Sequence, residues 1–318
     1  FGAALVWWKL RMLELTVTGS LDEPIAGSLL VPERLSSIPL ADLMSLRLPT
    51  ANTSYVRLEE LFWVQWPVGP SDTMVIRGDC RSIDRLGHGM TGGTLVVDGD
   101  AGDRVGLGIQ GGVILVAGNA GDEACAAMRG GTVAIAGSCG DRLGAPLPGE
   151  RSGIRGGDVM VAGNVGARAC QRMRRGTVWI AGDVGDYLAP HMIAGTVLVS
   201  GKTGSDWGVG MRRGSLVFSL APEREPGASL SPGRSLELSF LPLLWNHLRF
   251  LQGAIIAACA PLEKPSWTPL AVPSTRWVER RTGDRAIGGK GEILLLQRLS
   301  SAAPSLEPIS SENLPKTS

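Results

Sequence analysis

The chain has 318 residues, of which 44% are hydrophobic and 19% charged, and its formal net charge is +1. Such a nearly neutral chain is not a general nucleic-acid binder, because that function depends on an excess of basic residues. Its five cysteines form no C-x-x-C pair and are odd in number. They therefore predict free thiols in a reducing cytoplasm rather than a disulfide framework.

The N-terminal part is predicted to be an extension followed by a cap. Residues 1–11 carry their charges after their apolar residues, the reverse of a secretory signal, so we interpret them as an upstream extension with Met12 as the start. Residues 12–74 lack any repeat and contain strand-like stretches at 55–58 and 61–66. We expect them to form a small N-terminal cap, because an uncovered end of a stacked fold exposes a sheet edge.

A glycine repeat with a period of 19 residues dominates residues 75–220. Each repeat opens with a β-branched apolar run, which favours a strand. A second glycine follows the first after three positions, and a seven-residue insertion divides the repeats into two sets. A fixed period near twenty is typical of a solenoid. The first glycines of the repeats are Gly99, Gly118, Gly137, Gly163, Gly182 and Gly201.

This pattern predicts an all-β fold: a right-handed parallel β-helix of about seven coils, with the N-terminal cap and a C-terminal docking helix and strand. A large apolar residue recurs in every repeat and is expected to form a buried seam. A glycine-rich loop can also cradle phosphate, but the nucleotide fingerprint occurs once, between a strand and a helix, and not six times. The seam residues are Met90, Ile109, Met128, Ile154, Met173, Met192 and Met211.

Residues 221–298 follow a Pro-Gly-rich link and are predicted to be a docking region. The apolar stretch 240–260 is interrupted by polar residues and falls short of a membrane-spanning helix, so we expect it to dock on the stack or on a partner. A basic turn is predicted at 280–285 and a final strand at 291–296. The Ser-Pro-rich residues 299–318 are predicted to be a disordered tail.

The sequence offers no evident catalytic or metal site. Its three histidines have no metal-ligand spacing, and His191 alone, exposed or packed on a partner, is not a general base. Four aspartates each follow the second glycine of a repeat. Stacked carboxylates could form a metal ladder or an acid pair, but turn chemistry, in which the side chain bonds nearby backbone amides, is the expectation. These aspartates are Asp103, Asp122, Asp141 and Asp186.

A column of basic residues is the remaining candidate binding site. Arg129, Arg155, Arg174 and Arg212 each follow the seam residue of their repeat. If the repeats stack in register, neighbouring arginines lie ~5 Å apart and repel each other unless something acidic answers them. Two interpretations stay open: a solvated basic edge, or a track for an acidic ligand or partner.

The combined motifs resemble a known family. The repeats resemble the glycine-repeat β-helix shared by the C-terminal domain of glutamate synthase and the C subunit of formylmethanofuran dehydrogenase. The insertion at 144–153, the Met-Arg-Arg-Gly corner at 173–176 and the ending at 281–294 are similar to this C subunit. They are most similar to the version in the bacterial formyltransferase/hydrolase complex. The alternative is a glutamate synthase-like module with a purely structural role.

The resemblance implies a scaffold subunit that is not itself catalytic. It would belong to a hetero-oligomer with dehydrogenase-like, amidohydrolase-like and formyltransferase-like subunits, which hold the metals. That complex handles formyl units between tetrahydromethanopterin, methanofuran and formate. Methanofuran carries a glutamate-rich tail, to which the arginine column would be complementary. No nucleic-acid or membrane partner is implied, and hydrolase and dehydrogenase versions both stay open.

Overall fold

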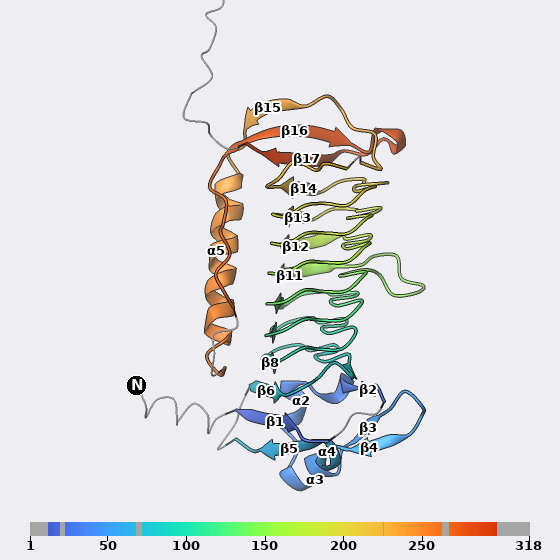
Figure 1. Ribbon diagram of the computed structural model, residues 1–318, viewed down its shortest axis with the longest axis vertical. Coiled ribbons are helices and arrows are strands. Elements are labelled where there is room, and N and C mark those ends of the chain that lie inside the picture. Colours follow the sequence, from blue (N-terminus) through green and yellow to red (C-terminus); the bar gives the residue numbers. More distant parts are fainter. Residues whose placement is uncertain (1–11, 20–22, 68–71, 225, 263–266, 298–318) are drawn as a thin grey trace, which may run out of the picture.

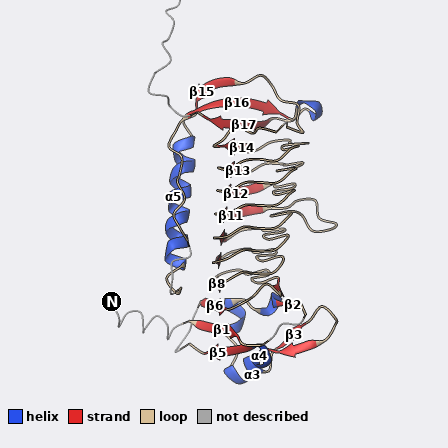
Figure 2. Cartoon of the chain, viewed as in Figure 1, coloured by secondary structure: helices blue, strands red, loops and turns tan. Residues whose placement is uncertain are grey.

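The structure is a computed structural model that describes residues 12–19, 23–67, 72–224, 226–262 and 267–297. The predicted upstream extension and the predicted tail lie outside the described residues. The described chain is mostly β, with one large, mainly parallel sheet and few helices (Figures 1 and 2).

The large sheet has thirteen described strands; ten of them pair in parallel and are stacked along the long axis of the molecule, each running across that axis (Figure 1). Neighbouring repeats pair in register, so that Thr94 lies opposite Val113 and Thr177 opposite Thr196. The parallel strands are β1 (Leu13–Val17), β6 (Thr73–Arg77), β8 (Thr94–Asp98), β9 (Val113–Val116), β10 (Thr132–Ile135), β11 (Arg155–Val161), β12 (Arg175–Ile180), β13 (Thr196–Val199), β14 (Ser215–Phe218) and β17 (Gly291–Leu296).

The strands β6, β8 to β14 and β17 bury side chains on both faces. In β8, Leu95 and Val97 point into the interior of the stack, whereas Val96 points to the outer face. There the helix α5 (Leu241–Ala258) covers the row of middle residues with Trp245 and other apolar side chains. Burial on both faces explains why these strands are continuous apolar runs rather than alternating ones.

A second row of backbone contacts and the predicted seam complete the interior. Single parallel bridges connect Ala101 to Ala120 and Ala120 to Cys139, and they continue through later repeats. All seven seam residues are buried, as predicted. The closing glycine Gly112 has φ +81°, and a β-carbon there would lie 2.6 Å from the carbonyl oxygen of Gly93. Only glycine fits such a position without strain.

The N-terminal part is joined directly to the stack. Strand β1 inserts between β6 and the antiparallel edge strand β5 (Phe62–Gln65), so it adds a parallel rung that the repeat pattern does not reveal. The smaller elements are η1 (Gly27–Leu29), α2 (Pro32–Leu35), α3 (Leu40–Met44), α4 (Leu58–Leu61) and the strand pairs β2 (Ile25–Ala26) with β7 (Ile83–Asp84) and β3 (Arg47–Pro49) with β4 (Tyr55–Arg57).

At the other end, the prediction of a basic turn at 280–285 is wrong for residues 280–283. Arg280 and Arg281 belong to β16 (Trp277–Gly283), which pairs antiparallel with β17 and with β15 (Arg234–Glu237). The chain turns only afterwards, through the short helix η2 (Arg285–Ile287). The predicted final strand is confirmed as β17, and it pairs parallel with β14. No helix among the described residues is long and apolar enough to cross a membrane.

A basic cleft as the candidate functional site

A cleft of about 810 Å³ opens where the last repeats meet the turn before β17. The insertion near 150 and the turn before β17 both project from the side of the stack opposite α5 (Figures 1 and 2). Among the described residues that line this basic cleft, there is no carboxylate. Its charged and imidazole side chains belong to Arg151, Arg172, His191, Arg212, Arg213 and Lys290.

Two of these side chains come from a position that is usually glycine. Arg172 and His191 precede the seam residue in neighbouring repeats, and their backbones adopt left-handed φ values of 51° and 56°. A β-carbon on Gly210, the equivalent residue of the next repeat, would lie 2.2 Å from His191 Nδ1. The imidazole therefore lies over a bare backbone, and Gly210 leaves the space that it occupies.

The far wall of the cleft extends beyond the repeats to Lys290. The Arg212 amide donates to the Met192 carbonyl at 2.8 Å, and the Lys290 amide donates to the Arg212 carbonyl at 2.7 Å. This register places Lys290 opposite Arg213, beside the arginine column, although it lies far along the chain. The sequence does not reveal this place, because the residues before Lys290 carry no 19-residue period.

One buried carboxylate holds this wall together without lining the cleft. Asp284 is 4% exposed. Its side chain accepts hydrogen bonds from the backbone amides of Gly210 at 3.2 Å and of Ser229 and Ala286 at 3.0 Å each. Because these amides occupy both oxygens, the carboxylate acts as a brace between three segments and is not a partner for the cationic side chains.

The structure brings the four predicted arginines to different surroundings. Arg212 lines the basic cleft, and Arg129 and Arg174 are exposed with no ion pair among the described residues. Arg155 donates from Nη2 to Glu150 Oε2 at 2.9 Å, so the insertion neutralises this one. Ile193 interrupts the column between Arg174 and Arg212.

The sequence places Arg213 beside Arg212, but it does not predict that Arg151 and Arg172 converge with them. A usable signal was present at one position only. Arg172 and His191 are the two large side chains in a place where other repeats have glycine or alanine. Arg151 had no such signal, because it lies in the insertion and its place depends on how that loop folds.

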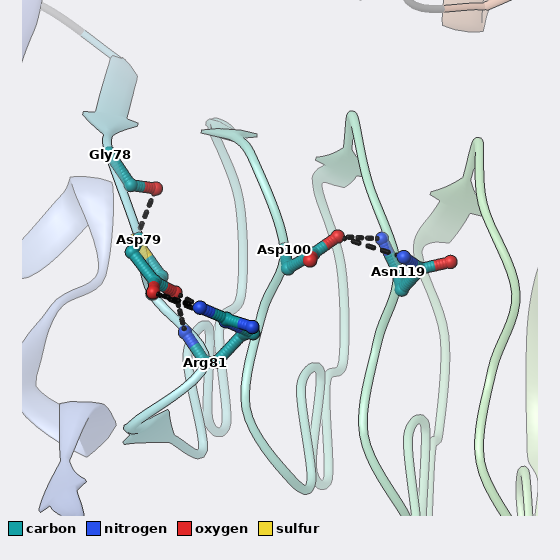
Figure 3. A network of polar contacts seen from close by, with 6 residues as sticks. Gly78, Asp79, Arg81, Asp100 and Asn119 are labelled. Atoms are coloured by element: carbon teal, nitrogen blue, oxygen red, sulfur yellow. Dashed lines mark hydrogen bonds and ion pairs between the residues drawn. The ribbon is translucent and has the colours of Figure 1, made fainter.

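The repeated aspartates connect one repeat to the next. The Oδ1 atoms of Asp103 and Asp122 each accept the backbone amide 19 residues later at 2.8 Å, that of Asp122 being the Asp141 amide. The expected bond to a backbone amide is confirmed, but the amide is in the next repeat, not in the same turn. Figure 3 shows the same arrangement in a neighbouring column, where Asp100 reaches both nitrogens of Asn119. We call Asp84, Asp103, Asp122, Asp141 and Asp186 the acidic column.

The thiols are structural groups of the interior. Cys125, Cys139 and Cys170 are buried and free. Burial raises the pKa of Cys139 and of Cys170 to about 12 and that of Cys125 well above its ordinary value. A thiol is a nucleophile only as thiolate, so these cysteines are inert at neutral pH.

The other two histidines, His88 and His247, do not line the basic cleft. His247 Nε2 is 3.0 Å from Asp158 Oδ1 and so connects α5 to β11. Burial, and then the charge of Arg85, lowers the pKa of His88. Among the described residues, no three His, Cys, Asp or Glu side chains gather as metal ligands.

Comparisons with known proteins agree with this architecture. No family model matches the chain. The C subunits of two tungsten-containing formylmethanofuran dehydrogenase 2 enzymes of Methanococcus maripaludis are 29% and 28% identical over 90 residues, or 28% of this chain. The alignment spans a third of the length of these curated relatives, 33% in each case.

A solved structure matches far more of the chain. It is the crystal structure of the formyltransferase/hydrolase complex FhcABCD from Methylorubrum extorquens with methylofuran, one chain of which is 30% identical with a TM-score of 0.75. The match covers 90% of this chain and 100% of that chain. The chain therefore belongs to the family formed by the C subunit of formylmethanofuran dehydrogenase and the related chain of the formyltransferase/hydrolase complex.

Proposed function

We propose that this chain is the C subunit of a bacterial formyltransferase/hydrolase complex, which moves formyl units between tetrahydromethanopterin, methanofuran and formate. The observation that carries the proposal is the match along the whole length of a chain from that complex. The glutamate synthase alternative has no comparable support. In the expected assembly, amidohydrolase-like and formyltransferase-like subunits contain the metals and the chemistry, beside a dehydrogenase-like subunit.

The chain is proposed to act as a scaffold in the form of a right-handed parallel β-helix. The in-register parallel strands, the second row of bridges and the closing glycines support this fold. In this proposal, residues 12–74 form the cap, 75–220 the β-helix and 221–298 the docking region. Exposed apolar side chains on α5, such as Leu243 at 72% and Phe250 at 74%, suit a further contact there.

Co-purification from the native host tests the assembly. A tagged chain is expected to bring down a formyltransferase-like and an amidohydrolase-like protein in fixed ratio, and loss of the chain is expected to abolish formate release by the extract. A chain that purifies without partners, and whose loss leaves that activity intact, contradicts the proposal.

The isolated chain is expected to have no turnover. Its thiols are buried, and among the described residues the histidine with a carboxylate partner, His247, uses Asp158 to connect α5 to β11, so we expect no catalytic centre there. Purified chain incubated with formylmethanofuran should neither hydrolyse nor oxidise it. Turnover that survives removal of contaminating subunits would show that the chain is catalytic.

The exposed arginine column is proposed to meet an acidic group of the assembly. Arg129 and Arg174 are the sharper pair for a test than Arg155, which Glu150 already neutralises. With both changed to Gln, loss of assembly indicates a contact with a neighbouring subunit. A second outcome is normal assembly with a KM that is raised for methanofuran carrying its glutamate-rich tail but unchanged for methanofuran without the tail. This outcome indicates that the column binds the cofactor tail. No change in either indicates a solvated edge and excludes both.

A further inference from the structure

Helix α5 is apolar on the side that faces away from the stack as well as on the side that covers it (Figure 1). Its outer side exposes Leu243 at 72% and Phe250 at 74%. The helix carries one formal charge, that of Arg249. A helix at a protein surface normally has polar side chains on its outer side, whereas a helix that is apolar all round is buried. The outer side of α5 therefore has the composition of an interface.

A notch lies in the middle of this outer side. Gly253 is exposed and helical, and a β-carbon added to it would meet no described atom within 4 Å. Glycine inside a helix lowers stability relative to alanine. Neither the backbone conformation nor the packing of the described chain accounts for a glycine there. A close approach by another molecule accounts for it, because glycine is the residue that lets two helices approach most closely.

The exposed residues of α5 form a stripe whose order of side-chain sizes is complementary to itself. They follow one another in alternating steps of three and four residues, as the a and d positions of a coiled coil do. The first half of the stripe has larger side chains and the second half has small ones. If two copies lie antiparallel about a two-fold axis between Leu251 and Gln252, each larger side chain faces a small one of the other copy. The facing pairs are Leu243 with Ala260, Asn246 with Ala257, and Phe250 with Gly253.

Charge and area set the strength of such a contact. In the antiparallel arrangement Arg249 lies beside Ile256 of the second copy, so the two guanidinium groups do not face each other. Its Nη1 donates to Asn246 Oδ1 at 3.0 Å. The stripe is about 26 Å long and about 10 Å wide. A contact of this size is at the small end of specific interfaces, so we expect a dissociation constant of about 1 to 100 μM.

From the apolar outer side, the notch and the reciprocal order of sizes, we infer that α5 forms the contact of a two-fold symmetric dimer of this chain. Phe250 of one copy enters the notch at Gly253 of the other, and the same contact recurs across the axis. A two-fold dimer requires such a self-complementary patch. The inference goes beyond the proposed function and does not depend on the other subunits. In an assembly, it places two copies of this chain side by side, with their stacks on opposite sides of the helix pair.

Sedimentation equilibrium of the full chain tests the dimer. Over about 1 to 200 μM the chain should pass from monomer to dimer. Gly253→Leu fills the notch and should weaken dimerisation at least about thirtyfold, because it removes the central packed contact. Its melting temperature, measured where the chain is monomeric, should not fall, since leucine has open space there and is the better helix former. A chain that stays monomeric over the whole range would overturn the inference.

Two matched variants separate this contact from general stickiness of exposed apolar side chains. Phe250→Gln should weaken dimerisation roughly tenfold, because the side chain that fills the notch is lost. Tyr55 is 65% exposed in the N-terminal part, away from α5, and Tyr55→Gln should change dimerisation less than about twofold. Equal losses in both variants, or a dimer that Gly253→Leu leaves unchanged, contradict a contact through α5.

Disulfide cross-linking tests the direction of the helix pair. The native thiols are buried, so they give little background. Chains with Asn246→Cys, mixed with chains with Ala257→Cys, should cross-link under mild oxidation, because these positions face each other. Ala257→Cys alone should not cross-link, since the two copies of this position lie about 16 Å apart along the helix axis and a disulfide spans less than about 7 Å between α-carbons. A product from Ala257→Cys alone would contradict the antiparallel pair.

The assembled complex shows whether the second copy is the occupant there. The two cysteine variants, co-expressed in the native host, should give the same cross-linked product within the purified complex. Product from the isolated chains but none from the complex would show that another subunit covers α5, and would overturn the inference for the assembly. A dimer that purifies without other subunits would contradict the proposed function but support the contact through α5.

Discussion

The acidic column and the arginine column run along the same stack at the same spacing, but their charged groups differ in the hydrogen-bond partners that the fold provides. Asp122 accepts the backbone amide of Asp141 in the next repeat, and other members of the column do the same. Among the described residues, no guanidinium of the arginine column has such a bond to the backbone of the next repeat, and Arg155 is the member with a carboxylate beside it.

The charges of the acidic column stabilise the fold, whereas those of the arginine column remain available to a partner. A charge-assisted hydrogen bond to an amide favours the carboxylate and connects two repeats, so the acidic column belongs to the fold. Cations that the fold leaves unpaired cost little in solvent and remain free for an acidic partner. A charged column in a stacked fold therefore indicates a binding surface only when its members have no backbone partner in the next repeat.

The largest effect is expected where the acidic and neighbouring columns need glycine. A β-carbon at Gly182 would lie 2.4 Å from Asn164 Oδ1 and 2.5 Å from the Gly163 carbonyl oxygen. Gly182→Val should lower the free energy of unfolding by more than about 3 kcal/mol in urea denaturation. Gly92→Val is the control, since nothing lies within 4 Å there, and should cost less than about 1 kcal/mol. Similar losses in both would contradict the close approach of repeats.

A smaller effect is expected in the acidic column itself. Asp122→Ala removes the acceptor of the Asp141 amide and should cost about 1 kcal/mol. Asp122→Asn keeps an acceptor oxygen and should remain within about 0.5 kcal/mol of the parent. Urea denaturation of the three proteins measures both. If Asn is as damaging as Ala, charge matters more than the bond between repeats.

The smallest effect is expected in the arginine column. Arg174→Gln should change the free energy of unfolding by less than about 0.5 kcal/mol, because no described residue pairs with it. Arg155→Gln loses the partly exposed contact with Glu150 and should cost up to about 1 kcal/mol. Thermal melts at matched salt measure both. A loss at Arg174 larger than that at Asp122 would reverse the distinction between the columns.

Several features could be predicted from the sequence because the same residue pattern recurs in each repeat. Seven seam residues and the strand runs recur with one period, so their burial and pairing follow from the pattern. The repeat predicts either a positive φ or a close approach at Gly118. The structure has the close approach, since a β-carbon there would be 2.3 Å from Asp100 Oδ1.

The rest depends on contacts that the repeat does not encode. Lys290 comes to lie opposite Arg213 only because β17 pairs with β14 after a long excursion of the chain. Arg151 reaches the basic cleft from a loop whose path no period determines. The site therefore lies where the regular stack meets irregular segments, and local pattern is weakest at such a place.

Helix α5 restricts how this molecule can evolve. At one end it follows β15, and at the other the carbonyl of Pro261 accepts a hydrogen bond from Arg77 Nη2 of β6 at 3.1 Å. Its 18 residues span about 27 Å. Duplication or deletion of one repeat would move the two anchors by ~4.8 Å and leave the helix too short or too long. The length of α5 therefore fixes the number of repeats between its two anchors, so a tolerated change of chain length in the stack is expected in loops rather than in whole repeats.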